Sequence, residues 1–152
     1  MQTFLPYSDF SESLKVLDNK RLGKQRLEAM QLVNSTLKLA DDPAAKVGWA
    51  NHPARTMWRG YLDALKLYHN LSILEWTSRG FKNTMKLYTI PFDKDIVMPP
   101  WLGHERFHAS HRANLLRKDP VHYGQFGWTE CPSMPYYWPT ETTIPVNYYA
   151  QN

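Results

Sequence analysis

The chain contains a single cysteine, Cys131, in 152 residues. One thiol cannot form an intrachain disulfide, which excludes the disulfide-stapled class of small secreted domains and fits a reducing compartment. The sequence also has no run of about 18 apolar residues, the length that would span a membrane. Its opening residues, MQTFLPYSDF, lack the charged and apolar regions of a signal peptide. We therefore expect a cytoplasmic protein without a membrane partner.

The composition favours a globular domain with an anionic partner. Hydrophobic residues make up 43% of the chain, which is enough for one core. The formal net charge is +4 and the isoelectric point is about 9.2. Aromatic residues make up 14%, including six Trp and nine Tyr. This is more than a small core usually needs, and aromatic rings also stack on exposed nucleobases, so the composition favours a nucleic-acid partner.

Hydrophobic periodicity predicts helices separated by proline-containing breaks. We expect a short helix capped by Ser8 or Asp9 and ending near Asp18, and longer helices over residues 20–39, 51–79 and 104–117. Residues 82–103 are expected to be irregular. The sequence thus predicts one all-α domain over residues 1–152, a compact bundle of about three main helices. An extended aromatic C-terminal tail is expected over residues 124–152.

Four polar residues on the helix expected over 20–39 form a stripe, Arg21, Lys24, Gln25 and Glu28, within about 100° of arc. They could form a solvated face with a Lys24–Glu28 ion pair. Alternatively, they could form a phosphate-facing surface that contains one acid or base group, with Arg26 adding positive charge nearby. Affinity for DNA through such a cluster would fall as salt rises.

The sequence HERFH at residues 104–108 matches the H-E-x-x-H pattern of zinc peptidases. It lies at the first turn of a helix just after Gly103, and Arg106 stands inside it, which weakens the zinc interpretation. The alternative is a second basic, phosphate-facing surface, made of His104, His108, His111, Arg112, Arg117 and Lys118.

Two further features have a structural and a functional interpretation. His52 and Trp58 flank the start of the helix expected over 51–79, either as a helix start with a core Trp or as the border of an anion or base pocket. The N-terminal α-amine has an ordinary pKa of about 8, so part of it is an uncharged nucleophile at neutral pH. Because Gln2 is too large for normal removal of the initiator Met, we expect that amine to belong to Met1.

Three segments together resemble the pyrimidine-dimer DNA glycosylases of the phage T4 endonuclease V type. They are residues 17–33, residues 52–83 with their closing Arg79-Gly80-Phe81, and residues 110–123 followed by the aromatic tail. The resemblance implies a small, basic, all-α enzyme that cuts the glycosidic bond with its N-terminal α-amine, helped by one glutamate on an early helix. It further implies cleavage of the DNA backbone as an AP lyase, by a monomer. No cofactor or metal is expected.

The same resemblance implies which residues carry the chemistry. The family has a His, then a Leu, and a Glu seven positions after the His; here Arg21, Leu22 and Glu28 have that spacing. This implies Glu28 as the catalytic carboxylate and Met1 as the source of the amine. Aligning the helix on Asp18 instead puts Leu27 at the catalytic position.

The sequence therefore predicts a glycosylase and AP lyase acting on damaged or modified pyrimidines in double-stranded DNA. The residues expected to contact DNA are Arg21, Lys24, Gln25, Arg26, His52, Trp58, His108, His111, Arg112, Arg117 and Lys118. Three alternatives stay open at this point. They are a non-catalytic DNA-binding protein of the same fold, a glycosylase for a hypermodified base, and a zinc hydrolase built on His104, Glu105 and His108.

Overall fold

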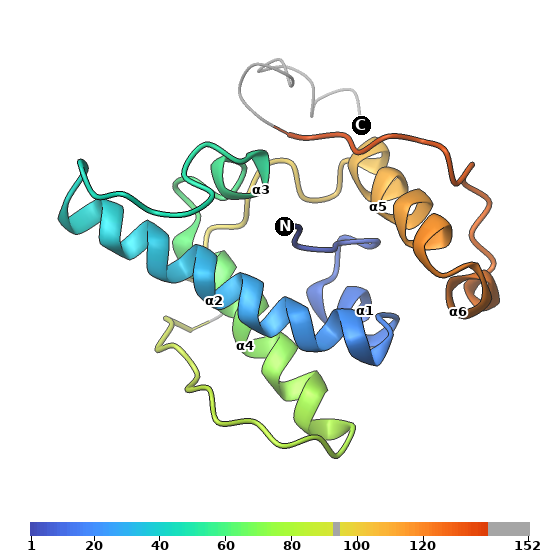
Figure 1. The fold of residues 1–152 in the computed structure, drawn as a ribbon, viewed down its shortest axis with the longest axis horizontal. Coiled ribbons are helices and arrows are strands. Elements are labelled where there is room, and N and C mark those ends of the chain that lie inside the picture. The colour runs from blue at the N-terminus through green and yellow to red at the C-terminus, as the bar shows by residue number, and fades with distance from the viewer. Residues whose placement is uncertain (93–94, 140–152) are drawn as a thin grey trace.

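The computed structural model describes residues 1–92 and 95–139, and these residues form helices joined by irregular segments, with no strand (Figure 1). The predicted all-α class is thus confirmed. The elements are α1 (Phe10–Lys15), α2 (Asn19–Asp41), α3 (Pro53–Thr56), α4 (Leu62–Ser78), α5 (Glu105–Lys118), α6 (Pro120–Tyr123) and the 3-10 turn η2 (Gly124–Phe126). Within this part of the chain, no helix is both long and apolar enough to cross a membrane.

The longest helices, α2 and α4, pack against one another and carry much of the core (Figure 1). Asp18 begins α2 by accepting a hydrogen bond from the Arg21 backbone N–H at 3.3 Å. Close packing depends on Gly23, because a Cβ there would lie 3.1 Å from the Trp76 ring. The helix face that carries Leu22, Ala29 and Val33 is buried against this neighbour and the rest of the core.

The single helix predicted over 51–79 is wrong, because the structure divides it into α3 and α4. Gly60 lies between them with φ of +86°, a left-handed conformation that a helix cannot contain. Trp58, two residues before Gly60, lies in the core and is 3% exposed. The expected C-terminal stop is present, since α4 ends at Ser78 and Gly80 has φ of +90°.

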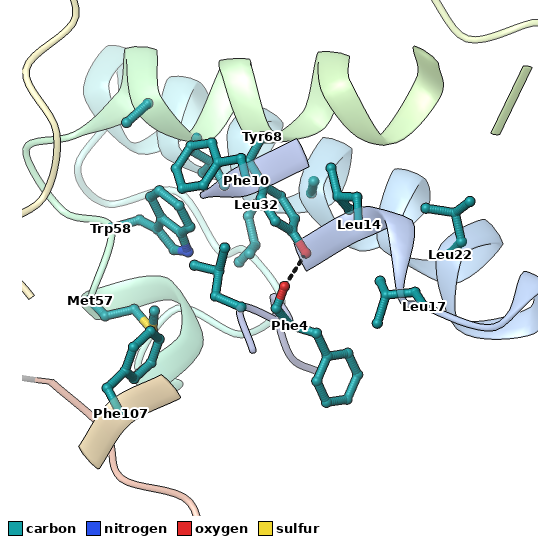
Figure 2. Packing of buried hydrophobic residues seen from close by; sticks show 14 of the residues in the cluster. Phe4, Phe10, Leu14, Leu17, Leu22, Leu32, Met57, Trp58, Tyr68 and Phe107 are labelled. Carbon is teal, nitrogen blue, oxygen red and sulfur yellow. Dashed lines mark hydrogen bonds between the residues drawn. The ribbon is translucent and has the colours of Figure 1, made fainter. Parts of the chain in front are cut away.

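The N-terminal segment, residues 1–6, runs through the middle of the molecule and not along its surface (Figure 1). Phe4 and Leu5 are part of the hydrophobic core, next to residues of α1, α2 and α4. In Figure 2 the Tyr68 hydroxyl points at the Phe4 carbonyl oxygen, 2.7 Å away. An extended segment buried in this way has no strand partner, so side chains must satisfy its backbone groups.

The C-terminal part of the chain covers α5. This helix ends at Lys118, before Pro120, as the sequence predicts. Trp128 stacks on Tyr123 with ring centroids 5.6 Å apart, while the Tyr137 ring stacks on His104 at 5.2 Å. The expected aromatic tail is thus in part a covering layer over residues 127–139, and its last stretch, 140–152, lies outside the described residues.

Candidate active site

A pocket of about 320 Å³ lies where α2, α5, the N-terminal segment and the C-terminal chain meet. This volume is in the range of ligand-binding clefts. Four cations and one carboxylate face it among its lining residues, which are Met1, Gln2, Phe4, Lys20, Arg21, Lys24, Gln25, Glu28, Lys118 and Tyr136. The stripe predicted on the helix over 20–39 is therefore one wall of a pocket, and Met1 and Lys118 complete it.

The carboxylate of Glu28 lies next to the start of the chain. Its Oε2 accepts a hydrogen bond from the Gln2 backbone N–H at 3.1 Å. The Met1 amine is one residue before that N–H, and Met1 itself lines the pocket. Leu27, the alternative position, does not line the pocket and is 45% exposed. The geometry thus places Glu28, and not Leu27, beside the N-terminus.

The buried side chain of Gln25 holds Glu28 and the N-terminal backbone together, and Gln25 is 1% exposed. Its Nε2 donates to the Gln2 carbonyl at 2.8 Å and lies 3.5 Å from Glu28 Oε2. Its Oε1 accepts from the Phe4 backbone N–H at 2.8 Å and lies 2.5 Å from the Tyr68 hydroxyl. One buried amide therefore ties the N-terminal backbone, the carboxylate and the core together.

Other residues predicted to contact DNA hold the same segment in place. Trp58 Nε1 donates to the Thr3 hydroxyl at 3.0 Å. His111 Nδ1 accepts from the Leu5 N–H at 2.9 Å, and His108 Nδ1 donates to the Leu5 carbonyl at 2.7 Å. Trp58, His108 and His111 are at most 3% exposed, which fits a structural role better than contact with DNA. Gln25 is also buried, but it lines the pocket.

Arg112 also binds the N-terminal segment, and it forms two ion pairs. Its NH1 donates to the Pro6 carbonyl at 2.8 Å, and its guanidinium pairs with Glu105 and Glu130. With 11% of its side chain exposed and both carboxylates in contact, its charge is already balanced. We therefore do not assign it to phosphate binding.

Arg21 is held at the pocket by a partly buried network. Its guanidinium pairs with Asp18 at 3.1 Å, and the Asp18 carboxylate also accepts from the Tyr123 hydroxyl. Burial raises the pKa of Asp18, but the hydrogen bonds from Tyr123 and Arg21 and the Arg21 charge outweigh burial and leave the pKa below its ordinary value. Asp18 is thus held ionised and fixes one cation of the pocket wall.

The lowered pKa of Lys118 shows that the positive charges around the pocket lie close together. Burial, and then the charges of Arg21, Arg117 and Lys24, lower the pKa of its amine. Arg117 is exposed nearby and donates to the Asn114 side chain and the Pro132 carbonyl. Like charges held together in this way gain stability when a polyanion neutralises them.

His52 borders this region from α3. Its Nδ1 accepts from the Ala54 N–H at 3.0 Å and begins the helix. Burial lowers its pKa, the positive N-terminal amine lowers it further, and the Glu28 charge opposes both. The ring is thus close enough to the amine and to Glu28 to be affected by their charges, although it does not line the pocket itself.

Arg26 is separated from the rest of the stripe. Its guanidinium lies 4.3 Å from the centre of the Trp76 ring on α4, and its NH1 donates to Asn83, in the segment after α4, at 2.6 Å. A cation bound in this way supports packing. The charge that Arg26 was expected to add to the phosphate-facing surface is therefore on another face of the helix.

The H-E-x-x-H segment does not form a metal site. Over residues 1–92 and 95–139, no three His, Cys, Asp or Glu side chains are placed to hold a metal ion together. Both nitrogens of His108 are engaged, because Nε2 accepts from the Gly103 N–H at 2.9 Å while Nδ1 binds Leu5. His104 caps α5, with Nδ1 accepting from the Phe107 N–H. The zinc-hydrolase alternative finds no support in this geometry.

Some pocket residues were absent from the prediction. Gln2, Phe4 and Tyr136 line the pocket, but none of them belongs to a pattern that the sequence displays. Burial raises the pKa of Tyr136 to about 12. Its place over the pocket depends on the path of the chain after α6, which sequence periodicity does not report.

The family model described as pyrimidine dimer DNA glycosylase matches residues 1–89, more than half of the chain. The chain therefore belongs to this family of DNA glycosylases. The match includes the N-terminal segment and α1 to α4, and hence Met1 and Glu28, while α5 lies beyond it. No curated protein and no solved structure matches the chain.

Proposed function

We propose that this protein excises a damaged or modified pyrimidine from double-stranded DNA and then cleaves the strand as an AP lyase. The observation that carries the proposal is the meeting of Met1 and Glu28 in one cationic pocket, with the Gln2 N–H bound to the carboxylate. Lys20, Arg21, Lys24 and Lys118 are placed to bind phosphates around it. Arg117 extends this surface, and His52 borders it.

In the proposed first step the Met1 amine attacks the sugar C1′, and the glycosidic bond breaks as the base leaves with the bonding electron pair and a proton. Opening of the sugar ring, with transfer of a proton to O4′, converts the C1′ adduct into an imine. Glu28 stabilises the positive charge that develops on the sugar.

In the second step Glu28 removes a proton from C2′. The C2′–H electrons form a C2′=C3′ double bond, and the C3′–O bond breaks with its electrons on oxygen, which releases the downstream strand with a 5′ phosphate. Water then hydrolyses the imine and restores the amine. The buried hydrogen bonds of Gln25 support this assignment, because they fix the backbone that carries the amine against the carboxylate.

Borohydride trapping tests the chemistry directly, since it reduces an imine to a stable covalent bond. We expect an adduct with ultraviolet-irradiated or abasic duplex DNA, and peptide mapping should place it on Met1. A chain acetylated at its N-terminus is the matched control and should bind DNA without forming the adduct. An unblocked chain that forms no adduct with any damaged, abasic or hypermodified duplex would leave the non-catalytic DNA-binding alternative.

A further inference from the structure

Trp49 differs from the other tryptophans of the chain in its exposure. Half of its surface, 50%, is accessible to solvent, while Trp58 and Trp101 are each 3% exposed and no further Trp is among the exposed residues. Tryptophan side chains are enriched at binding interfaces, because the indole offers a large, flat apolar face to a partner.

The backbone of Trp49 is also unusual. Its φ of +64° is left-handed, and among the described residues no other non-glycine residue has a positive φ. A bulky side chain rarely adopts this conformation, and such strain concentrates at functional sites. The surrounding turn fixes it, since the Trp49 carbonyl accepts from the His52 N–H at 3.0 Å and the next carbonyl, of Ala50, accepts from Arg55 at 3.4 Å.

A row of aromatic rings connects Trp49 to the pocket. Trp49 meets His52 edge to face at 5.3 Å, and His52 meets Trp138 in the same manner at 5.5 Å. Trp138 lies 5.5 Å from Tyr136, which lines the pocket. Trp49 is thus the solvent-facing end of a row whose other end borders the proposed reaction site.

We propose that Trp49 stacks on a nucleobase that leaves the duplex next to the lesion. This inference rests on the proposed function, because a pyrimidine can reach the pocket only if the duplex opens there. The opened duplex exposes an apolar base face, and a rigid half-exposed indole with no charge is suited to that face. The cations on α2 and α5 would bind phosphates, while Trp49 would bind the base.

The test is binding of a duplex that contains a tetrahydrofuran abasic-site analogue, which cannot form an imine and so isolates binding from chemistry. Trp49→Leu and Trp49→Ala should weaken this binding by roughly 5- to 150-fold, and Trp49→Phe should keep most of it. Binding of undamaged duplex should not change. The loss should be equal at low and high salt, because no phosphate contact is removed.

A fluorescent reporter makes the contact visible. We expect 2-aminopurine placed next to the abasic analogue to be quenched in the complex with the unaltered protein and brighter with Trp49→Leu. Phe92→Ala is the control, since Phe92 is 81% exposed but lies outside the aromatic row. Thermal unfolding of each variant should match that of the unaltered chain.

The outcomes separate this inference from the proposed function. If Trp49→Leu and Trp49→Ala bind the abasic duplex as tightly as the unaltered protein, the inference is wrong, while borohydride trapping still decides the chemistry. If the unaltered protein forms no adduct yet its binding depends on Trp49, the chemistry is wrong and the stacking role stands. If the unaltered protein does not distinguish abasic from undamaged duplex, the inference is overturned.

Discussion

The backbone N–H of Gln2 donates a hydrogen bond to the Glu28 carboxylate at 3.1 Å. This contact joins the first residues of the chain to a helix 26 positions later, and it orients one oxygen of the only carboxylate that lines the described pocket. Charge-assisted hydrogen bonds of this type are stronger than neutral ones. The carboxylate is therefore held in one position beside the N-terminal amine before any DNA is bound.

Glu28→Gln should strongly slow strand cleavage and leave DNA binding intact. The amide keeps the size of the side chain and can still accept from Gln2, but it carries no charge and cannot take the C2′ proton. We expect cleavage to fall by about 10²- to 10⁴-fold, the usual contribution of a general base. Single-turnover cleavage of an abasic duplex measures the loss, and a gel-shift assay measures binding.

Glu12→Gln is the matched control for this change, because Glu12 is an exposed carboxylate on α1 that pairs with Lys15. It should cleave as the unaltered protein does. Normal cleavage by Glu28→Gln would remove Glu28 from the mechanism and would require another acid.

Gln25→Glu should impair cleavage more than it impairs folding. The new carboxylate still accepts from the Phe4 N–H and from Tyr68, but it no longer donates to the Gln2 carbonyl and it repels Glu28. Gln25→Ala loses all of these bonds and should lower the free energy of unfolding by about 1–3 kcal/mol for each polar group left unpaired. Urea unfolding and trapping yield, measured on both variants, separate the two effects.

Tyr68→Phe is the control that separates a loss of stability from a loss of cleavage. The Tyr68 hydroxyl stabilises the same segment without contacting Glu28, so its loss should cost about 1 kcal/mol of stability and little cleavage. Equal loss of cleavage in Tyr68→Phe and Gln25→Glu would show that Gln25 acts through stability alone.

The sequence predicted those parts of the fold and site that depend on local pattern. The stripe of Arg21, Lys24, Gln25 and Glu28 follows from helical spacing, and the structure places all four on the pocket wall. The ends of α4 and α5 follow from Gly80 and Pro120. The break between α3 and α4 was missed because apolar periodicity continues across Gly60.

The role of the buried polar residues could not be predicted in this way. His111 binds Leu5 across 106 positions of sequence, and Trp58 binds Thr3 across 55. These pairings exist only because the N-terminal segment passes through the core without a strand partner. Periodicity reports which face of a helix is buried, but it does not report which backbone group lies against that face.

Removing positive charge from the pocket should weaken DNA binding in a salt-dependent manner. Lys24→Ala and Lys118→Ala each remove one cation that lines the pocket. If each binds a phosphate, the slope of log affinity against log salt should become shallower by about 0.9 per substitution. Lys38→Ala, at the far end of α2, is the control and should leave the slope unchanged. Unchanged slopes for Lys24→Ala and Lys118→Ala would place the DNA elsewhere.

The stability of the protein should fall as the solution becomes acidic, and His111 should account for part of this. Burial lowers the pKa of His111 well below its ordinary value, and the charges of His108 and Arg112 lower it further. Below about pH 6.5 the unfolded chain binds a proton at this position and the folded chain does not. Protons therefore favour the unfolded state, and the free energy of unfolding should fall by up to about 1.4 kcal/mol per pH unit from this group.

His111→Asn tests the assignment. The Asn oxygen can accept from the Leu5 N–H as Nδ1 does, but the side chain does not titrate. We expect urea unfolding at about pH 7 and about pH 5 to show a smaller pH dependence in the variant. The difference should correspond to one proton fewer taken up on unfolding. His108 also has a pKa lowered by burial, so part of the dependence should remain. A variant with the full pH dependence of the unaltered protein would show that His111 is not held neutral by the fold, and the acid sensitivity would then belong to other groups.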